Sequence, residues 1–249
     1  MTHAYSKDGK PRHYVDDGKG VTRDTTLRDM RKNDWLPSVT DILGVADKPG
    51  LNRYFQNQIL EAGYYTDVPG RNYDEWCKEV RQKADEHSAK ARDAGIAVHN
   101  SLERAFLGKE VTDEHLEAVD AVSSALYEKY GELEKAKTEV TFAYNSEGYG
   151  YGGTIDLVLP DVIIDYKRKA DGWEKKKNGD PKKIWYVESH AAQLAAYRAG
   201  TGMHDAKCAN VFISPDNEVW IHEWSDEDLA QGLSIFMASL NLWKTLKKF

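Results

Sequence analysis

The sequence predicts an α+β fold in which a central mixed sheet is flanked by helices, with a helical lobe on its N-terminal side. Two observations predict it. Helical periodicity dominates from Ser38 to about residue 130. Three strands then follow closely, and a helix separates them from a further strand pair, an order typical of α+β domains.

The first half of the chain is expected to be mostly helical. Residues 1–35 form a polar, glycine-containing segment with a short hairpin around Tyr14. The predicted helices span about 38–46, 50–62, 73–107 with a break at Gly95, and 112–130 with Thr112 or Asp113 as N-cap. The segment 36–131 would then form one wall of a cleft.

The second half, 132–249, is expected to hold the sheet. Strands are predicted at about 136–144, 152–159, 162–168, 207–213 and 218–224, with a helix at 189–200. The glycine-rich run Glu147–Gly153 is interpreted as a turn, and Ser225 caps a final helix.

Two carboxylates lie within apolar strands that meet at Pro160-Asp161. If these two residues are the centre of the hairpin turn, Asp156 lies opposite Asp165, and Lys167 shares the face of Asp165. Like charges in that position need a cation between them. Lys167 could neutralise one carboxylate, but two oxygen ligands also suit Mg²⁺ or Mn²⁺. An ordinary solvated strand pair is the alternative.

Four motifs resemble the RecB-like branch of the PD-(D/E)XK nuclease superfamily. They are Gly153-Thr154-Ile155-Asp156, Asp165-Tyr166-Lys167, Gln193 with Tyr197 four residues on, and Gly95 with His99 four residues on. The segment Pro37–Leu43, followed by Lys48–Leu51, is similar to the leader of phage-encoded and mitochondrial-type DNA exonucleases. The resemblance spans roughly residues 36–197.

The resemblance implies a restriction-endonuclease-like α/β/α core and a metal site for one or two ions of Mg²⁺ or Mn²⁺. Its ligands would be His99, Asp156, Asp165 and the main-chain carbonyl of Tyr166. Lys167 would lie beside the scissile phosphate, where it could orient or deprotonate water or donate to the developing charge.

Four further positions could support this site. Gln193 and Tyr197 share one face of an alanine-rich helix, where the resemblance implies that they brace the catalytic residues; a helix simply packed by its alanines is the alternative. Glu103 follows His99 by one helical turn and could be a partner of that ligand. Glu139, in the preceding strand, could reach Lys167 or the ligands, and His99 could also be purely structural.

Composition excludes several classes of protein. Hydrophobic residues make up 41% and charged residues 30% of 249, which argues against disorder. Cys77 and Cys208 are the only cysteines, so a four-cysteine iron–sulfur cluster, present in some RecB-type relatives, is excluded. No stretch resembles a signal peptide or a membrane span, so we expect no membrane association and a cytoplasmic location in a bacterial or phage-infected cell.

The charge is unevenly distributed. The net charge is −7, yet residues 167–183 hold eight lysines and arginines against three acids, which leaves −12 on the rest. We interpret 168–188 as a basic flap that follows the catalytic strand, with a solvated loop as the alternative. The candidate DNA-binding residues are Lys169, Lys175, Lys176, Lys177, Lys182 and Lys183.

These inferences predict a metal-dependent exonuclease acting on DNA ends in phage or bacterial recombination, repair or degradation. A recombination or single-strand-binding protein would be a natural partner. A structure-specific or flap endonuclease is one alternative, and a non-cleaving DNA-binding or adaptor protein is another. An unrelated interaction domain with an acidic surface is a third.

Serine in place of five lysines of this segment should weaken DNA binding and flatten its salt dependence, because fewer phosphate contacts form and fewer counterions are released on binding. The five are Lys175, Lys176, Lys177, Lys182 and Lys183. Fluorescence anisotropy over a salt series measures both quantities. Unchanged affinity and slope would refute a flap that binds the DNA backbone.

Overall fold

The computed structural model describes residues 2–16, 18, 20–46, 49–67, 72–169, 172–179 and 188–249. The chain divides into two compact units. One comprises Met1–Ala46 and Ser101–Phe249, and the other is Asp47–Asn100. The second unit holds α3 (Pro49–Tyr64) and the larger part of α4 (Tyr73–Phe106), whose last turns belong to the first unit.

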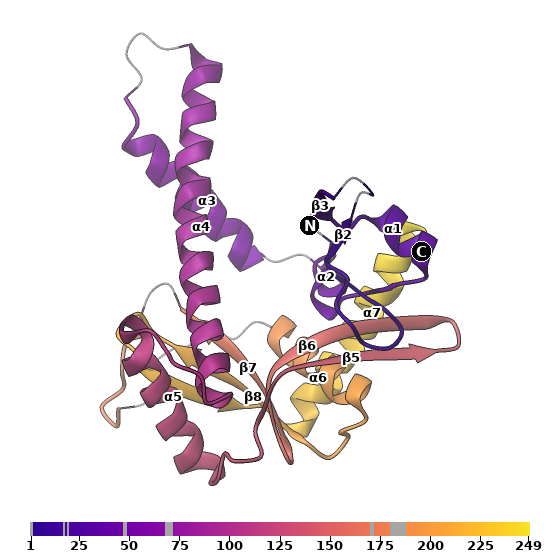
Figure 1. Cartoon of the computed structure of the whole chain (residues 1–249). Helices are drawn as coiled ribbons and strands as arrows, with labels where there is room; N and C mark the ends of the chain where they lie inside the picture. The colour runs from indigo at the N-terminus through magenta and orange to yellow at the C-terminus, as the bar shows by residue number, and fades with distance from the viewer. Residues whose placement is uncertain are drawn as a thin grey trace. The chain divides into compact units, whose positions relative to one another are not determined.

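A five-stranded mixed sheet forms the centre of the first unit (Figure 1). Its strands, in spatial order, are β5 (Lys137–Ser146), β6 (Tyr149–Leu159), β7 (Val162–Arg168), β8 (Lys207–Ile213) and β9 (Val219–Glu223). Strands β7 and β8 are parallel, whereas the other neighbours are antiparallel. The parallel pair requires a crossover, which α6 (Glu188–Thr201) provides. The predicted mixed sheet is confirmed.

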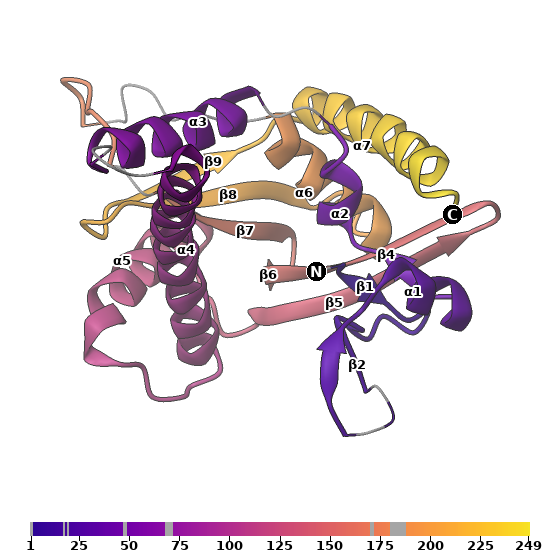
Figure 2. The same cartoon turned by 90° about the horizontal axis from the view of Figure 1, so that it is seen from above.

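Helices flank this sheet, as the sequence predicts (Figure 2). Helix α6 packs on β5 to β8, and α7 (Asp226–Lys247) packs on α6. The short helix α2 (Val39–Leu43) contacts both α6 and α7, while α5 (Asp113–Tyr130) contacts β8 and β9. None of the described helices combines the length and apolar character needed to cross a lipid bilayer.

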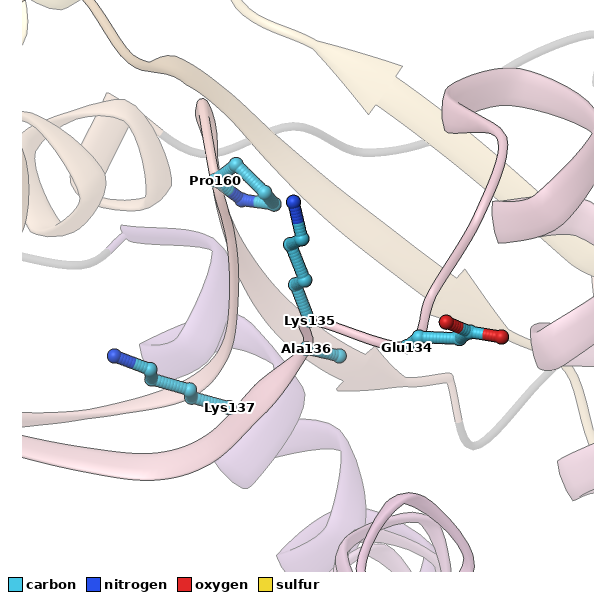
Figure 3. A pocket seen from close by; sticks show the side chains of 5 residues that line it. All are labelled: Glu134, Lys135, Ala136, Lys137 and Pro160. Carbon is cyan, nitrogen blue, oxygen red and sulfur yellow. The ribbon is translucent and has the colours of Figure 1, made fainter.

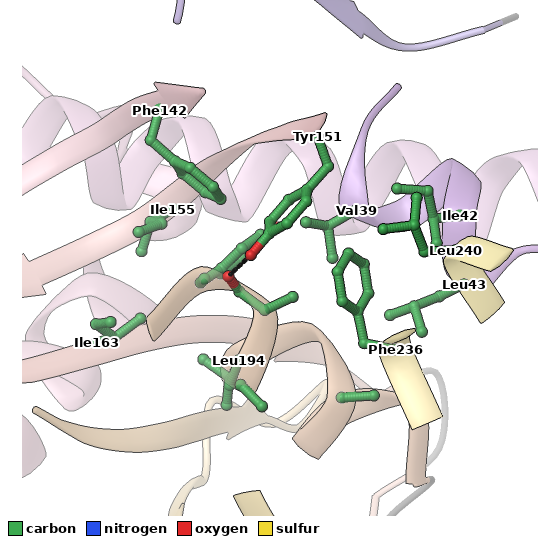
Figure 4. Packing of buried hydrophobic residues seen from close by; sticks show 14 of the residues in the cluster. Val39, Ile42, Leu43, Phe142, Tyr151, Ile155, Ile163, Leu194, Phe236 and Leu240 are labelled. Carbon is green, nitrogen blue, oxygen red and sulfur yellow. Dashed lines mark hydrogen bonds between the residues drawn. The ribbon is translucent and has the colours of Figure 1, made fainter. Parts of the chain in front are cut away.

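The core lies between the sheet and the layer formed by α2, α6 and α7 (Figure 4). Phe236 of α7 meets the Tyr151 ring at a centroid distance of 4.7 Å. The Tyr151 hydroxyl donates to the carbonyl of Ala196 at 3.2 Å, so this buried polar group is satisfied. The core thereby fixes α6 against β6, which positions the polar residues of α6 over the sheet.

The N-terminal segment is part of this core and more structured than its polarity suggests. Strand β1 (Ala4–Tyr5) pairs with β4 (Leu36–Pro37). The predicted hairpin around Tyr14 is confirmed as β2 (Tyr14–Asp16) and β3 (Thr22–Asp24). A helix that the sequence analysis did not predict, α1 (Leu27–Asn33), begins with a capping box between Thr26 and Asp29. Its single buried residue, Met30, gives too little periodicity to reveal it.

Two expectations about glycines are wrong. Helix α4 continues through Gly95 without a break, because one glycine costs a helix interior only about 1 kcal/mol. The run Glu147–Gly153 is not a turn as a whole: β5 ends at Ser146 and β6 begins at Tyr149. Position 152 of β6 requires a glycine, because a Cβ atom there would approach the Cβ of Tyr5 to 2.6 Å.

The helix caps follow the predicted residues. Ser225 and Asp228 form a reciprocal capping box at the start of α7. Thr112 occupies the N-cap position of α5, although its side chain makes no capping hydrogen bond there.

Gly232→Ala should lower the free energy of unfolding by about 1–3 kcal/mol, because overpacking forces backbone shifts. A Cβ atom at Gly232 in α7 would lie 2.8 Å from the main-chain carbon of Ala191 in α6, which cannot move aside. Gly63→Ala is the matched control, since its Cβ would meet Trp76 at an ordinary 3.6 Å. Urea denaturation should show that this control is neutral or stabilised; equal losses in both variants would contradict the argument.

Candidate active site

The site forms where β6 and β7 separate. The predicted hairpin register is confirmed by the pairs Leu159–Val162, Val158–Ile163 and Leu157–Ile164. The described ladder ends at the pair Leu157–Ile164. Asp156 and Asp165 are therefore not paired in the ladder, and the predicted direct opposition of these two residues is wrong. Instead, the main-chain N–H of Tyr166 donates to Asp156 Oδ2 at 2.7 Å. Asp156 therefore occupies the place that a strand partner would otherwise take.

Asp165 is a buried carboxylate with several donors. Its residue is 3% exposed. Lys167 Nζ lies 2.6 Å from Oδ2, and Asn210 Nδ2 donates to the same oxygen at 2.7 Å. Gln193 Nε2 donates to Oδ1 at 2.8 Å. These contacts replace the water that burial removes, and Lys167 supplies the cation that the sequence analysis expected beside this carboxylate.

Gln193 connects α6 to the sheet. Its amide nitrogen also donates to the Tyr197 hydroxyl at 2.9 Å, and its oxygen accepts from Lys167 Nζ at 3.3 Å. The two residues therefore share a helical face, as their spacing predicts. Burial, and then the charge of Asp165, raises the pKa of Tyr197 well above its usual value, so its hydroxyl stays neutral.

Burial and two neighbouring acids disfavour the ionised form of Asp156. Burial, and next the charge of Asp165, raises the pKa of Asp156 to about 8, against the opposing effects of Lys167 and the Tyr166 N–H. Glu139 adds to this repulsion. In β5, Glu139 lies between residues Thr138 and Val140, which pair with Leu157 and Ile155 of β6. Its backbone has a left-handed φ of 49°. Non-glycine residues rarely adopt this conformation.

The pKa of Glu139 is itself raised, first by partial burial and then by the charge of Glu103. Glu103 lies in the last turns of α4, which belong to the first unit. Of the two acids named from the sequence as possible supporting residues, Glu139 adds to the repulsion at Asp156, and Glu103 acts on Glu139. A cation bound at Asp156 and Asp165 would relieve the repulsion at Asp156.

The donor set fits a hard divalent cation. Asp156 and Asp165 offer carboxylate oxygens, and Tyr166, directly after Asp165 in sequence, offers a main-chain carbonyl. Mg²⁺ is commonly held by one or two carboxylates together with water. Within the described parts of the chain, no group of three His, Cys, Asp or Glu residues is arranged to hold an ion. A metal here would therefore depend on the two carboxylates, a carbonyl and water.

His99 belongs to the unit Asp47–Asn100, on the other side of the division within α4. Its role as a ligand stays a prediction.

The predicted DNA-binding lysines lie in different surroundings. Lys169 is half-buried, with Nζ 4.8 Å from the centre of the Phe212 ring, and burial lowers its pKa. Lys175 forms an ion pair with Glu218, whereas Lys176 and Lys177 are exposed. Lys182 and Lys183 lie outside the described residues.

Two residues near the site were not predicted from the sequence: Asn210, and Tyr5, which contacts Thr154 from the N-terminal segment. Asn210 is fully buried in β8 beside Asp165, and Trp224 Nε1 donates to its Oδ1 at 2.8 Å. The Tyr5 hydroxyl lies 2.9 Å from Thr154 Oγ1. An amide inside the apolar run Cys208–Ile213 was the available signal for Asn210.

A surface hollow lies elsewhere, at the start of β5 and the turn between β6 and β7 (Figure 3). Its lining residues are Glu134, Lys135, Ala136, Lys137 and Pro160. It shares no residue with the cluster around Asp165 and does not contribute to the candidate site.

No family model matches the chain, and no curated protein matches it. Among solved structures, the chain is similar to a protein called "Putative exonuclease" from Eubacterium rectale, with 14% identity and a TM-score of 0.51. That match covers 91% of this chain and 87% of the other. An alkaline exonuclease from Laribacter hongkongensis has 16% identity and a TM-score of 0.34, covering 79% of this chain and 94% of the other. The Eubacterium rectale likeness shows a shared fold.

The contribution of Asp156 to the free energy of unfolding should fall as pH rises from about 4 to 8 in the presence of chelator. Asp156 has a folded pKa of about 8, above its unfolded value, so the folded state holds the extra proton in this window. Asp156 alone changes the free energy of unfolding by at most about 1.4 kcal/mol per pH unit. Asp156→Asn keeps an acceptor for Tyr166 and should flatten the slope measured by urea denaturation; an unchanged slope would refute the assignment.

Proposed function

We propose that this chain is a divalent-metal-dependent DNA exonuclease of the RecB-like PD-(D/E)XK type, which hydrolyses phosphodiester bonds from DNA ends. The observation that carries the proposal is that the Asp165 carboxylate, which lies close to Asp156, contacts both Lys167 and Gln193. Lys167 Nζ is 2.6 Å and Gln193 Nε2 is 2.8 Å from the Asp165 carboxylate. Two of the sequence motifs are thus in direct contact across 28 residues of chain.

The fold supports the same proposal, since the Eubacterium rectale protein that shares it is named as an exonuclease. The acidic cluster supports metal dependence, because a divalent ion would offset the charges that raise the pKa of Asp156. Asp156, Asp165 and the Tyr166 carbonyl would hold Mg²⁺ or Mn²⁺ together with water, and His99 stays a ligand predicted from the sequence resemblance alone. Such an ion would supply an activated water and neutralise charge on the phosphoryl oxygens.

Lys167 would act directly on the substrate. Its side chain is 27% exposed, so the ammonium group can face both the site and an incoming phosphate. An ammonium is a compact charge suited to a phosphate oxygen. Gln193 holds the ammonium from one side, and Tyr197 in turn holds Gln193. Two residues of α6 would therefore keep Lys167 aligned during proton transfer or charge stabilisation.

DNA binding and biological context belong to the same proposal. The exposed Lys176 and Lys177, with the other lysines of 168–188, would bind the DNA backbone near the site. The activity would serve recombination, repair or degradation of phage or bacterial DNA. A recombination or single-strand-binding protein would then be a suitable partner.

The test is digestion of end-labelled linear DNA and closed circular DNA, each single- and double-stranded, with Mg²⁺, Mn²⁺ or chelator. Lys167→Ala should slow cleavage of linear DNA at least about 100-fold, since a positioned acid–base group contributes about 10²–10⁴-fold. Lys207→Ala is the control, because Lys207 forms an exposed ion pair with Glu223 on the same sheet.

Metal-dependent loss of linear DNA alone, with Lys207→Ala as active as the native chain, would support the exonuclease. Cleavage of circles would indicate an endonuclease instead. Absence of cleavage in every condition would leave DNA binding without catalysis as the better account.

A further inference from the structure

Asn210 is a buried polar residue in the middle of an apolar strand. It is 0% exposed, and its neighbours in β8 from Cys208 to Ile213 are also buried. A buried amide that lacks hydrogen bonds is costly, so its partners explain its presence. Asn210 stands directly beside Asp165 in the parallel ladder and beside His222 in the antiparallel one.

The orientation of the Asn210 amide is fixed by Trp224. The indole Nε1 donates to Asn210 Oδ1 at 2.8 Å. Because an indole N–H can only donate, the amide oxygen must face Trp224, and the NH₂ group must face Asp165. Asn210 Nδ2 then donates to Asp165 Oδ2 at 2.7 Å and to its main-chain oxygen at 3.3 Å.

The three described donors to the Asp165 carboxylate differ in how freely they can move. Lys167 has a flexible side chain that is 27% exposed, and Gln193 is partly exposed on another element. Asn210 is enclosed in the sheet and held at both ends of its amide. When Lys167 or Gln193 shifts toward a ligand, Asn210 can keep its bond to Asp165.

We propose that Asn210, oriented by Trp224, is a positioning residue that fixes the Asp165 carboxylate in the direction needed to bind a divalent cation. The inference rests on the proposed function only in taking Asp165 as a metal ligand. Asn210 is too deeply buried to touch DNA, so its effect reaches the reaction through Asp165. Partners of this kind commonly contribute about 10–100-fold to metal affinity.

The test is Mn²⁺ binding by the whole chain, measured by isothermal titration calorimetry. Asn210→Leu, which has a similar volume and no donor, should weaken Mn²⁺ binding about 10–100-fold. Trp224→Phe keeps an aromatic ring but removes the N–H that orients the Asn210 amide. It should weaken Mn²⁺ binding about 5-fold, which corresponds to one neutral hydrogen bond. Cys208→Ala is the matched control, on the same strand and equally buried, and should bind normally.

DNA cleavage separates positioning from general loss of structure. In Asn210→Leu at limiting Mn²⁺, kcat should fall while the KM for DNA stays constant, and excess Mn²⁺ should restore turnover. Far-ultraviolet circular dichroism checks the fold, and Trp224→Phe carries the test if Asn210→Leu does not fold.

The outcomes distinguish the two proposals. Normal Mn²⁺ affinity in both Asn210→Leu and Trp224→Phe would overturn the positioning role alone. Weakened affinity in these variants, with no DNA cleavage by the native chain, would overturn the proposed function and support the positioning role. A native chain that binds no Mn²⁺ would overturn the positioning role and the metal dependence together.

Discussion

Burial of the Asp165 carboxylate is the constraint on which the site depends. An ionised carboxylate withdrawn from water is stable only when cations and donors surround it. Here they come from β7 itself, from α6 and from β8, through Lys167, Gln193 and Asn210. The crossover that makes β7 and β8 parallel also carries α6 over the sheet. The buried Asp165 carboxylate therefore needs this order of strands and helix, because its donors come from β7, α6 and β8.

Much of this arrangement follows from local sequence. The alternation of β6 and β7 and their short turn determine the hairpin register, and the four-residue spacing of Gln193 and Tyr197 determines their common face. What the sequence did not reveal is the point where β6 and β7 separate. The Tyr166 N–H bonds to the side chain of Asp156 instead of a strand carbonyl, a choice that depends on tertiary packing.

The same limit applies to Asn210 and to the glycines of β6. An amide in an apolar strand suggests a buried partner, but the partner is on a strand 45 residues away. Glycines at 150, 152 and 153 resemble a turn when read locally. They lie in a strand, where glycine is needed because side chains of Leu36, Tyr5 and Tyr197 approach the backbone closely, and these contacts join distant parts of the chain. Long-range close packing of this kind has no local signature.

The contact between Tyr5 and Gly152 has a consequence for biosynthesis. The surface that Tyr5 covers on β6 is translated almost 150 residues after Tyr5 itself. Until then its aromatic ring can contact His13 but not β6. Strand β1 can pair with β4 early, but it can dock on β6 only after β6 has been made. In a growing chain, β1 is therefore made long before the strand against which it finally packs.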